Sequence, residues 1–289
     1  NSAVTSEFGD DIDVVAAITL GDGDDGFSHR FMELAQQHNE PIDAVYVHLY
    51  RVNPSQTTYF FTHETESLGV FLTQYGYSEN TPVYITEWNR NIPVYAQSPA
   101  SQAYLTSVLT IFNDLWEGND GNSSYGVSTL RMAHFFAARS FFWEENGRIK
   151  PPGITWSVYG EMVANTPVRL QNEGGFPSDS IDSNEFNILA GKSENGSQIG
   201  VLLSRYVDEN ASQPNAFSEF NDTVNLSVDG LDVSCDYTWQ HWGMVNNDSE
   251  PWQLIAEGNF AGSTFELSHF EMNQRSFHYI QLKSNSSCQ

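Results

Sequence analysis

The feature that most constrains the fold is a change of pattern along the 289-residue chain. Up to about residue 170, short β-branched and aromatic runs alternate with segments of helical period, which is typical of strand–helix units in a parallel sheet. After residue 183, short alternating runs separated by polar turns predict antiparallel strands. The segment between them, QNEGGFPSDSIDS at 171–183, is rich in Gly, Pro, Ser and Asp. The sequence therefore predicts an α/β domain at 1–170 and a β-sandwich domain at 171–289.

About four strand–helix units are predicted in the first domain. Strands are expected at 13–20, 42–50, 82–88 and within 128–143. Helices are expected at 27–38, 66–77, 98–118 and 151–166. Ser98 and Pro99 suit the N-cap and first residue of the third helix, and Gly118 suits its end. In the second domain, the Asn-Gly pair at 195–196 stands between two apolar runs and predicts a hairpin.

A single carboxylate, Glu87, stands where the third predicted strand ends, within TPVYITEWNRN. Because the carboxyl ends of parallel strands meet at one edge of the sheet, polar and aromatic residues from neighbouring strand ends should gather around it. The expected members of this substrate-binding group are His48, Tyr50, Trp88, Asn89, Arg139 and Trp143. A carboxylate among donors and aromatic rings suits a glycosidase nucleophile, which attacks the anomeric carbon while a second carboxyl about 5 Å away protonates the leaving oxygen.

The segment YITEWN resembles the nucleophile segment of the clan A retaining glycoside hydrolases, in which a Glu ends the seventh strand of a (β/α)8 TIM barrel. IDAVYVHLY before it and AHFFAARSFFWEENGRIKPPGITWSVYGEM after it are similar to strand six, strand eight and the last helix of glycoside hydrolase family 39, the β-xylosidase and iduronidase group. That family also carries a β-sandwich beside the barrel. The agarase and porphyranase family 86 shares this architecture and is the second choice. The resemblance covers roughly residues 10–165.

The resemblance implies a role for each matching residue. Glu87 matches the nucleophile, and His48 and Tyr50 match strand-six residues that hydrogen-bond to substrate or nucleophile. Trp143 matches the aromatic residue under the sugar. From the residues alone, other interpretations stay open: Glu87 as a surface acid paired with Arg90, and the His, Tyr and Trp side chains as packing residues.

The resemblance further implies that 1–170 forms only the C-terminal half of the barrel, strands five to eight. A complete barrel takes about 250 residues, and the acid/base Glu of the family follows an Asn at the end of strand four. Only about 40 residues precede IDAVYVHLY here. The Asn-Glu-Pro of HNEP, at His38–Pro41, matches the acid/base tripeptide but lies between a predicted helix and strand, at the opposite face of the sheet. We therefore expect the acid/base outside this chain.

Three explanations for the missing half are left open. The chain is one piece of a nicked or truncated larger protein, a subunit that completes a barrel supplied by an N-terminal half-barrel fragment or partner chain, or a relic that binds sugar without cleaving it. The first two predict a retaining O-glycoside hydrolase acting on a β-linked oligo- or polysaccharide. The third predicts a non-catalytic carbohydrate-binding protein.

The charge of the chain argues against two classes of partner. Lys and Arg total 12 against 37 Asp and Glu, which gives a formal net charge of −25. Such a chain repels phosphate backbones and anionic lipid surfaces, so neither nucleic acid nor a membrane is an expected partner. The longest apolar runs fall short of the about 20 residues that span a bilayer.

A secreted or periplasmic location is expected. No signal peptide is visible at residues 1–10, so any export signal was removed or never existed. The two cysteines, Cys235 and Cys288, form one disulfide in an oxidising compartment or are two thiols, and the sequence leaves both readings open. Asn-x-Ser/Thr sequons give weak support for secretion. The clustered carboxylates of GDGDDG at Gly21–Gly26 allow a calcium loop, but the loop lacks the distant bidentate Glu of an EF-hand, so a solvated loop is favoured and neither a metal nor a cofactor is expected.

Overall fold

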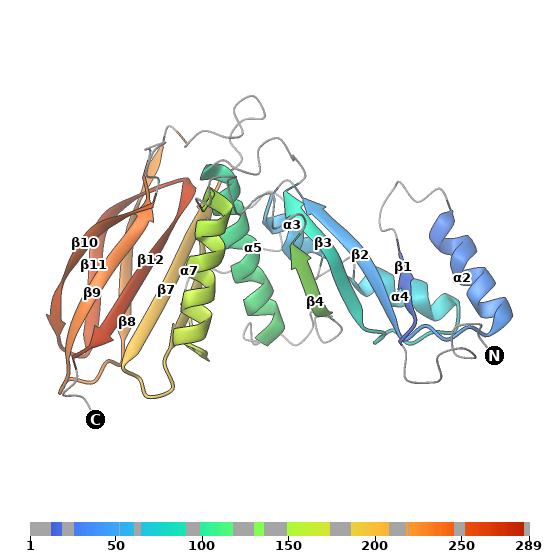
Figure 1. The fold of residues 1–289 in the computed structure, drawn as a ribbon, viewed down its shortest axis with the longest axis horizontal. Coiled ribbons are helices and arrows are strands. Elements are labelled where there is room, and N and C mark those ends of the chain that lie inside the picture. The colour runs from blue at the N-terminus through green and yellow to red at the C-terminus, as the bar shows by residue number, and fades with distance from the viewer. Residues whose placement is uncertain are drawn as a thin grey trace.

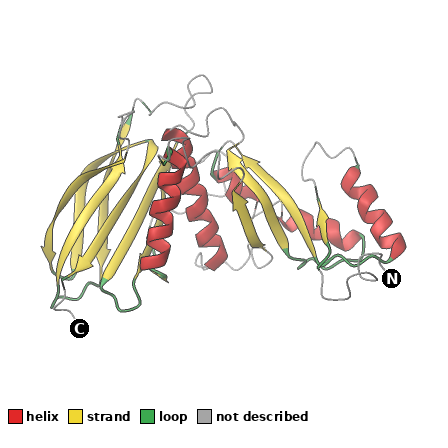
Figure 2. Ribbon diagram, in the orientation of Figure 1, coloured by secondary structure: helices red, strands yellow, loops and turns green. Residues whose placement is uncertain are grey.

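The structure is a computed structural model of the 289-residue chain. It describes residues 13–18, 26–51, 53–60, 65–90, 99–117, 130–135, 149–173, 186–207, 218, 220–245 and 252–285. An α/β part containing the N-terminus lies at one end of an elongated molecule, and a β-sandwich lies at the other (Figure 1). Helices separate the two groups of strands (Figure 2).

The α/β part is built on a four-stranded parallel sheet in the order β1-β2-β3-β4. Its strands are β1 (Val15–Ala17), β2 (Ala44–Arg51), β3 (Val83–Arg90) and β4 (Leu130–Phe135). The helices are α2 (Phe27–His38), α3 (Ser55–Tyr59), α4 (Thr65–Gln74), α5 (Pro99–Glu117) and α7 (Pro151–Asn165). The predicted alternation of strands and helices is confirmed, and α5 begins at Pro99 as its start signals indicated.

One face of this sheet packs against the helices. In β2 the side chains of Val45, Val47 and Leu49 are buried, whereas the intervening Tyr46, His48 and Tyr50 are more exposed. Met32 of α2 and Leu105 of α5 join the same hydrophobic cluster. The period of two along β2 therefore separates a core face from a face that carries polar and aromatic groups.

The sandwich contains a six-stranded antiparallel sheet in the order β10-β9-β12-β7-β6-β5 and the two-stranded sheet β11-β8. Its strands are β5 (Val168–Arg169), β6 (Phe186–Lys192), β7 (Gln198–Tyr206), β8 (Asn221–Asp229), β9 (Asp236–Met244), β10 (Trp252–Ala261), β11 (Thr264–Asn273) and β12 (Arg275–Ser284). The predicted hairpin at Asn195-Gly196 is confirmed, because β6 and β7 pair across it and Gly196 takes the left-handed φ of 72°. Cys235 is disulfide-bonded. Cys288, the other cysteine of the chain, lies outside the described residues.

Helices α5 and α7 join the two parts (Figure 1). Every residue of α5 from 100 to 112 is buried. Towards the sandwich, the hydroxyl of Ser107 lies 2.8 Å from that of Ser204, and the ring of Tyr104 packs edge-on against Tyr206 at 5.8 Å. A helix that is buried all round belongs to the interior of a larger unit, so α5 is a shared core element of both parts.

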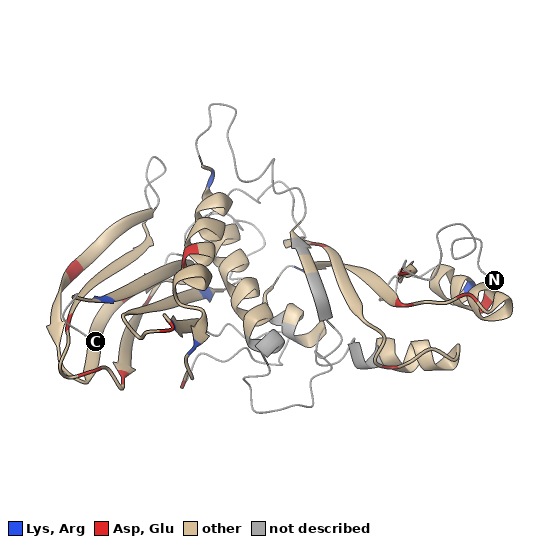
Figure 3. Ribbon diagram, turned by 60° about the horizontal axis from the view of Figure 1, so that its bottom comes forward, with Lys and Arg blue, Asp and Glu red and all other residues tan. Residues whose placement is uncertain are grey.

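Acidic residues outnumber basic residues about threefold in this chain. Asp and Glu occur in both the α/β part and the sandwich, and Lys and Arg are sparse (Figure 3). Among the described residues, no helix is long and apolar enough to cross a membrane. The described part of the chain also contains no group of three or more His, Cys, Asp or Glu arranged to hold a metal ion.

Candidate active site at the carboxyl end of the parallel sheet

A β-bulge in β3 places Glu87 on the open face of the sheet. Val47 pairs with Ile85, but the next residue of β2, His48, pairs with Glu87, so Thr86 is an extra residue in the ladder. Without the bulge, the period of two would put Glu87 on the core face with Ile85. With it, Glu87 shares the face of His48, and bulges commonly re-aim a side chain next to an active site in this way.

Two side chains from β2 converge on one oxygen of Glu87. The hydroxyl of Tyr50 donates a hydrogen bond to Oε2 of Glu87 at 2.8 Å. Nδ1 of His48 lies 3.3 Å from the same oxygen. The side chains of His48 and Glu87 are 47% and 32% exposed, so the group is open to a ligand. Oε1 of Glu87 makes no hydrogen bond to any residue that the structure describes.

The environment keeps Tyr50 protonated. Burial raises the pKa of the Tyr50 hydroxyl well above its usual range, and the hydrogen bond to Glu87 and the charge of that carboxylate raise it further. Tyr50 therefore remains a hydrogen-bond donor at every ordinary pH. A donated hydrogen bond of this kind stabilises the ionised form of a carboxylate.

Tyr46 is a further aromatic residue of this face that the sequence-based prediction missed. Its ring lies 6.0 Å from that of His48, and the His48 ring lies edge-on to Tyr50 at 6.4 Å. The signal was present in the sequence, because Tyr46, His48 and Tyr50 alternate at the spacing that puts strand residues on one face. These three rings form a continuous aromatic row beside Glu87.

The remaining predicted residues have different positions. Trp88 is only 1% exposed and packs against Phe112, Phe135 and Trp156. The structure therefore does not bring its ring to the cluster, contrary to expectation, because the bulge turns the residue after Glu87 into the core. Asn89 lies opposite Tyr50 in the register and is buried. Arg139, Trp143 and the loop at 21–25 lie outside the described residues.

The Asn-Glu-Pro tripeptide lies far from this cluster along the strand direction. Glu40 precedes β2 by four residues, at the amino end of the sheet, and its backbone oxygen accepts a hydrogen bond from the hydroxyl of Tyr77 at 3.0 Å. Glu87 is near the carboxyl end of β3. Glu40 is therefore not placed to act together with Glu87.

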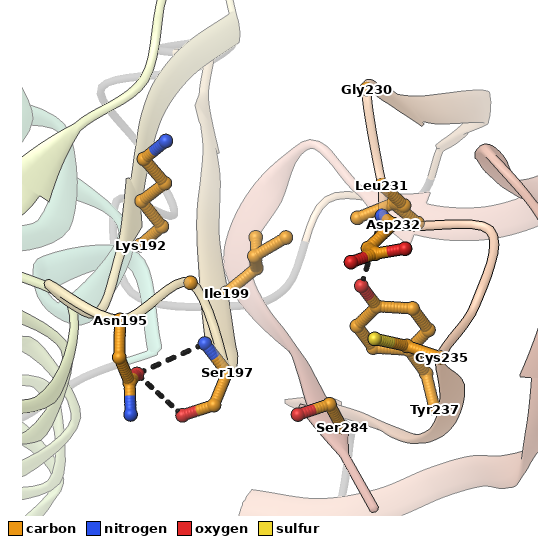
Figure 4. A pocket seen from close by; sticks show the side chains of 11 residues that line it. Lys192, Asn195, Ser197, Ile199, Gly230, Leu231, Asp232, Cys235, Tyr237 and Ser284 are labelled. Carbon is orange, nitrogen blue, oxygen red and sulfur yellow. Dashed lines mark hydrogen bonds between the residues drawn. The ribbon is translucent and has the colours of Figure 1, made fainter. Parts of the chain in front are cut away.

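A separate hollow of about 390 Å³ lies at one end of the sandwich (Figure 4). Ile199, Leu231 and Tyr237 contribute buried apolar surface to it. Its polar groups are occupied by local turns: Oδ1 of Asn195 accepts hydrogen bonds from the backbone N and the hydroxyl of Ser197 at 3.1 and 2.7 Å. Hydrogen bonds from Ser234 likewise lower the pKa of Asp232. This hollow therefore offers a ligand few uncommitted polar atoms.

The four-stranded parallel sheet with its strand-end carboxylate and the attached antiparallel sandwich together make a mixed α/β architecture. No protein-family model and no curated protein sequence matches the chain. Solved structures do match, and those reported below are glycoside hydrolases.

A glucosidase from Croceicoccus marinus is 15% identical with a TM-score of 0.61, over 95% of this chain and 60% of that one. A monomeric β-xylosidase from Caulobacter crescentus CB15 is 12% identical with a TM-score of 0.56, over 88% of this chain and 58% of that one. A thermostable family 51 α-L-arabinofuranosidase from Thermotoga petrophila RKU-1 is 14% identical with a TM-score of 0.50, over 93% of this chain and 57% of that one. The chain shares their fold and spans about three fifths of their length.

Proposed function

We propose that the chain is part of a retaining glycoside hydrolase that acts on a β-linked oligo- or polysaccharide, with Glu87 as the nucleophile. The observation that carries the proposal is the convergence of Tyr50 and His48 on Oε2 of Glu87 at the carboxyl end of the parallel sheet. Catalytic groups of α/β barrels lie at this end. The family 39 resemblance and the glycoside hydrolase fold point to the same chemistry, with family 86 as the second choice.

The geometry suits the nucleophile of a double displacement. Tyr50 and His48 hold Oε2, which orients the carboxylate and leaves Oε1 to attack the anomeric carbon. As the bond from Glu87 to that carbon forms, the bond to the leaving oxygen breaks, and that oxygen takes a proton from a carboxylic acid. The same group, now a carboxylate, removes a proton from the water that releases the sugar. Tyr46, Asn89, Arg139 and Trp143 complete the proposed sugar-binding surface.

The proton-donating carboxyl is proposed to come from outside these residues. Among the described residues, the side chains in contact with Glu87 are Tyr50 and His48, and neither is a carboxylate. In the described part of the sheet, β1 and β4 are each paired on one side. We propose that the described sheet is strands five to eight of a barrel and that an N-terminal half-barrel fragment or partner chain supplies the other strands and the acid/base. This chain covers only 60% of the matched glucosidase and 58% of the matched β-xylosidase, which supports this view.

A secreted or periplasmic location is proposed with this function. The disulfide at Cys235 supports it, because structural disulfides persist in oxidising compartments. The net charge of −25 supports the view that neither nucleic acid nor a membrane surface is the partner.

A non-catalytic carbohydrate-binding protein is the second candidate, favoured by the single carboxylate of the described cluster. Labelling with 2-deoxy-2-fluoro glycosides of xylose, glucose and galactose, followed by intact-mass and peptide mapping, separates the two. The native preparation should be used together with any co-purifying chain. A glycosyl adduct on Glu87 that is absent from Glu87→Gln and retained in Glu40→Gln supports the hydrolase. An adduct on another residue overturns the assignment of Glu87, and binding of the sugars without any adduct supports the binding protein.

A further inference from the structure

A groove of about 610 Å³ on the sandwich is lined by polar side chains whose hydrogen-bonding capacity is largely unused. It lies on strands β9, β10 and β12, which are neighbours in the six-stranded sheet (Figure 1). Trp239 of β9 also lines the groove. The groove is separate from Glu87, because it belongs to the sandwich and Glu87 belongs to the parallel sheet.

The side chains of the groove form two cross-strand rows. Gln240 pairs with Glu257 on one side and with Gln281 on the other. Thr238 likewise pairs with Asn259 and Lys283. Adjacent strands are about 4.8 Å apart, so each row is about 10 Å long. The two rows make a flat polar array on three adjacent strands.

This array is on the outer face of the sheet. The intervening residues of β12, Ile280 and Leu282, are fully buried in the sandwich core. Further along β12, Phe277 and Tyr279 share the outer face with the array and pack under Val158 and Met162 of α7. Helix α7 therefore covers one end of the outer face and reaches Gln281 through Glu161, whereas Thr238, Glu257, Asn259 and Lys283 are exposed beside it.

Gln281 makes only long hydrogen bonds through its side chain. It is only 5% exposed, yet its Nε2 donates only at 3.4 Å to the Tyr279 hydroxyl and at 3.5 Å to Oε1 of Glu161. Both distances are at the upper limit for a hydrogen bond. Oε1 of Gln281 makes no hydrogen bond to any described residue. The Gln281 amide therefore keeps hydrogen-bonding capacity that a ligand in the groove can use.

The other side chains of the two rows likewise make long hydrogen bonds or none to the described residues. Nε2 of Gln240 donates to Oε2 of Glu257 at a long 3.3 Å. The hydroxyl of Thr238 donates to the backbone oxygen of Lys283, also at 3.3 Å. Neither the Asn259 amide nor the Lys283 ammonium has a hydrogen-bond or ion-pair partner within the described part of the chain. The hollow at the other end of the sandwich differs, because its Asn195 and Asp232 are already hydrogen-bonded.

The functional groups in the two rows indicate which class of ligand the groove can bind. They present amide and hydroxyl groups that both donate and accept, and their one cation and one anion, Lys283 and Glu257, cancel. A protein with a net charge of −25 disfavours an anionic ligand. A peptide would require apolar pockets for its side chains, and the polar rows provide none. A neutral, hydroxyl-rich chain matches both the donors and the acceptors.

We propose that this groove is a second saccharide-binding surface, which binds a stretch of neutral oligosaccharide or polysaccharide away from the Glu87 cluster. The surface extends beyond the proposed hydrolysis and does not rest on it, since none of its residues contacts Glu87 in the structure. In a hydrolase it would hold a polymer close to the enzyme, and in a binding protein it would add a second point of attachment.

Calorimetric titration of the whole chain with xylohexaose, cellohexaose, laminarihexaose and agarohexaose tests the surface. The titrations use Glu87→Gln, so that the sugars are not cleaved. We expect at least one hexaose to bind, and the added pair Gln240→Ala and Asn259→Ala to weaken it by about tenfold or more, because two hydrogen bonds are lost. Lys283→Gln, which retains a donor, should weaken it less.

The matched control is the pair Lys192→Ala and Asn195→Ala in the other hollow, which should leave the affinity unchanged. The surface is overturned if none of the four hexaoses binds, if the Gln240 and Asn259 pair binds as tightly as its parent, or if the control pair weakens binding equally. If Glu87 forms the glycosyl adduct but no sugar binds in the groove, only the proposal of the second binding surface fails. If a sugar binds in the groove but no adduct forms, only the proposal of a hydrolase fails. Thermal unfolding of each variant shows that it folds.

Discussion

At the scale of single residues, the site depends on how one carboxylate oxygen is held. Tyr50 donates to Oε2 of Glu87 at 2.8 Å, and burial together with that carboxylate keeps the phenol protonated. The hydroxyl thus serves as a positioning group with a fixed proton. His48 contacts the same oxygen from a more exposed position at 3.3 Å.

Removing the Tyr50 hydroxyl is expected to impair catalysis more than substrate binding. A hydrogen bond to a charged group contributes about 1.5–3 kcal/mol, so Tyr50→Phe should lower kcat by about ten- to a hundredfold with a small change in KM. Steady-state kinetics on the unfluorinated aryl glycoside of the sugar that labels Glu87 would measure this. Tyr77→Phe is the matched control, because Tyr77 donates to the backbone of Glu40 instead. A kcat for Tyr50→Phe that equals the control value would show that the contact has no catalytic role.

At the scale of secondary-structure elements, the bulge in β3 separates the positions of Glu87 and Trp88. Thr86 occupies the extra position, and Ile85 and Trp88 both reach the core while Glu87 stays on the open face. The Thr86 hydroxyl is buried without a hydrogen-bond partner among the described residues. Thr86 therefore contributes the extra backbone position of the bulge, and its hydroxyl adds no hydrogen bond there.

Deleting Thr86 is expected to preserve the fold and impair the site. The remaining pairs of β2 and β3 can form a regular ladder, but the local bend that aims Glu87 is lost. A displacement of about 1 Å at a reacting group costs about a hundredfold in rate. Activity should fall by that amount, whereas urea denaturation should give a cooperative transition. Thr86→Val keeps the bulge and should retain activity within about twofold, so equal activity of the deletion variant would contradict a role for the bulge.

The sequence predicted the elements better than the site. The order of strands and helices and the start of α5 at Pro99 were readable from apolar periodicity and capping residues. Strict alternation along PVYITEW, however, would place Val83, Ile85 and Glu87 on one face of the strand. No residue type in this segment predicts a bulge. For the same reason Trp88 was expected at the site and is found in the core. Tyr46 could have been predicted from its spacing to His48 and Tyr50.

At the scale of the whole molecule, the sandwich core contains a buried pair of neutral histidines. Nε2 of His241 and Nδ1 of His278 lie 2.8 Å apart, and Phe270 packs against both rings. Burial lowers the pKa of His241 to about 4, and burial and then His241 lower that of His278 to about 3. These residues pair β9 with β12, and β12 lies in the sheet that contacts α5.

The chain is expected to lose stability as the pH falls from about 6.5 towards 4. Below about pH 6.5 the unfolded chain binds protons on both histidines and the folded chain does not, so the stability present above pH 6.5 is progressively lost. At pH 5 the loss should be about 2 kcal/mol per histidine. Urea denaturation at a series of pH values measures it.

The double variant His241→Gln and His278→Leu should show a shallower decline with pH, and the exposed control His29→Gln should decline like the parent. Because α5 is buried between the two parts, their spectroscopic signals should change in one transition. Acid-independent stability between pH 7 and 5 would contradict the assignment of both histidines as neutral.

The full burial of α5 also has a consequence for biosynthesis. Ala100 to Phe112 leave the ribosome long before β7, which begins at Gln198, and β12, which begins at Arg275. Until those strands are made, the face of α5 that will contact them stays uncovered, and such nascent surfaces attract chaperones and other nascent chains. The packing of this helix is thus completed late in synthesis, and separate expression of 1–170 and 171–289 would leave α5 and its partner strands without their mutual cover.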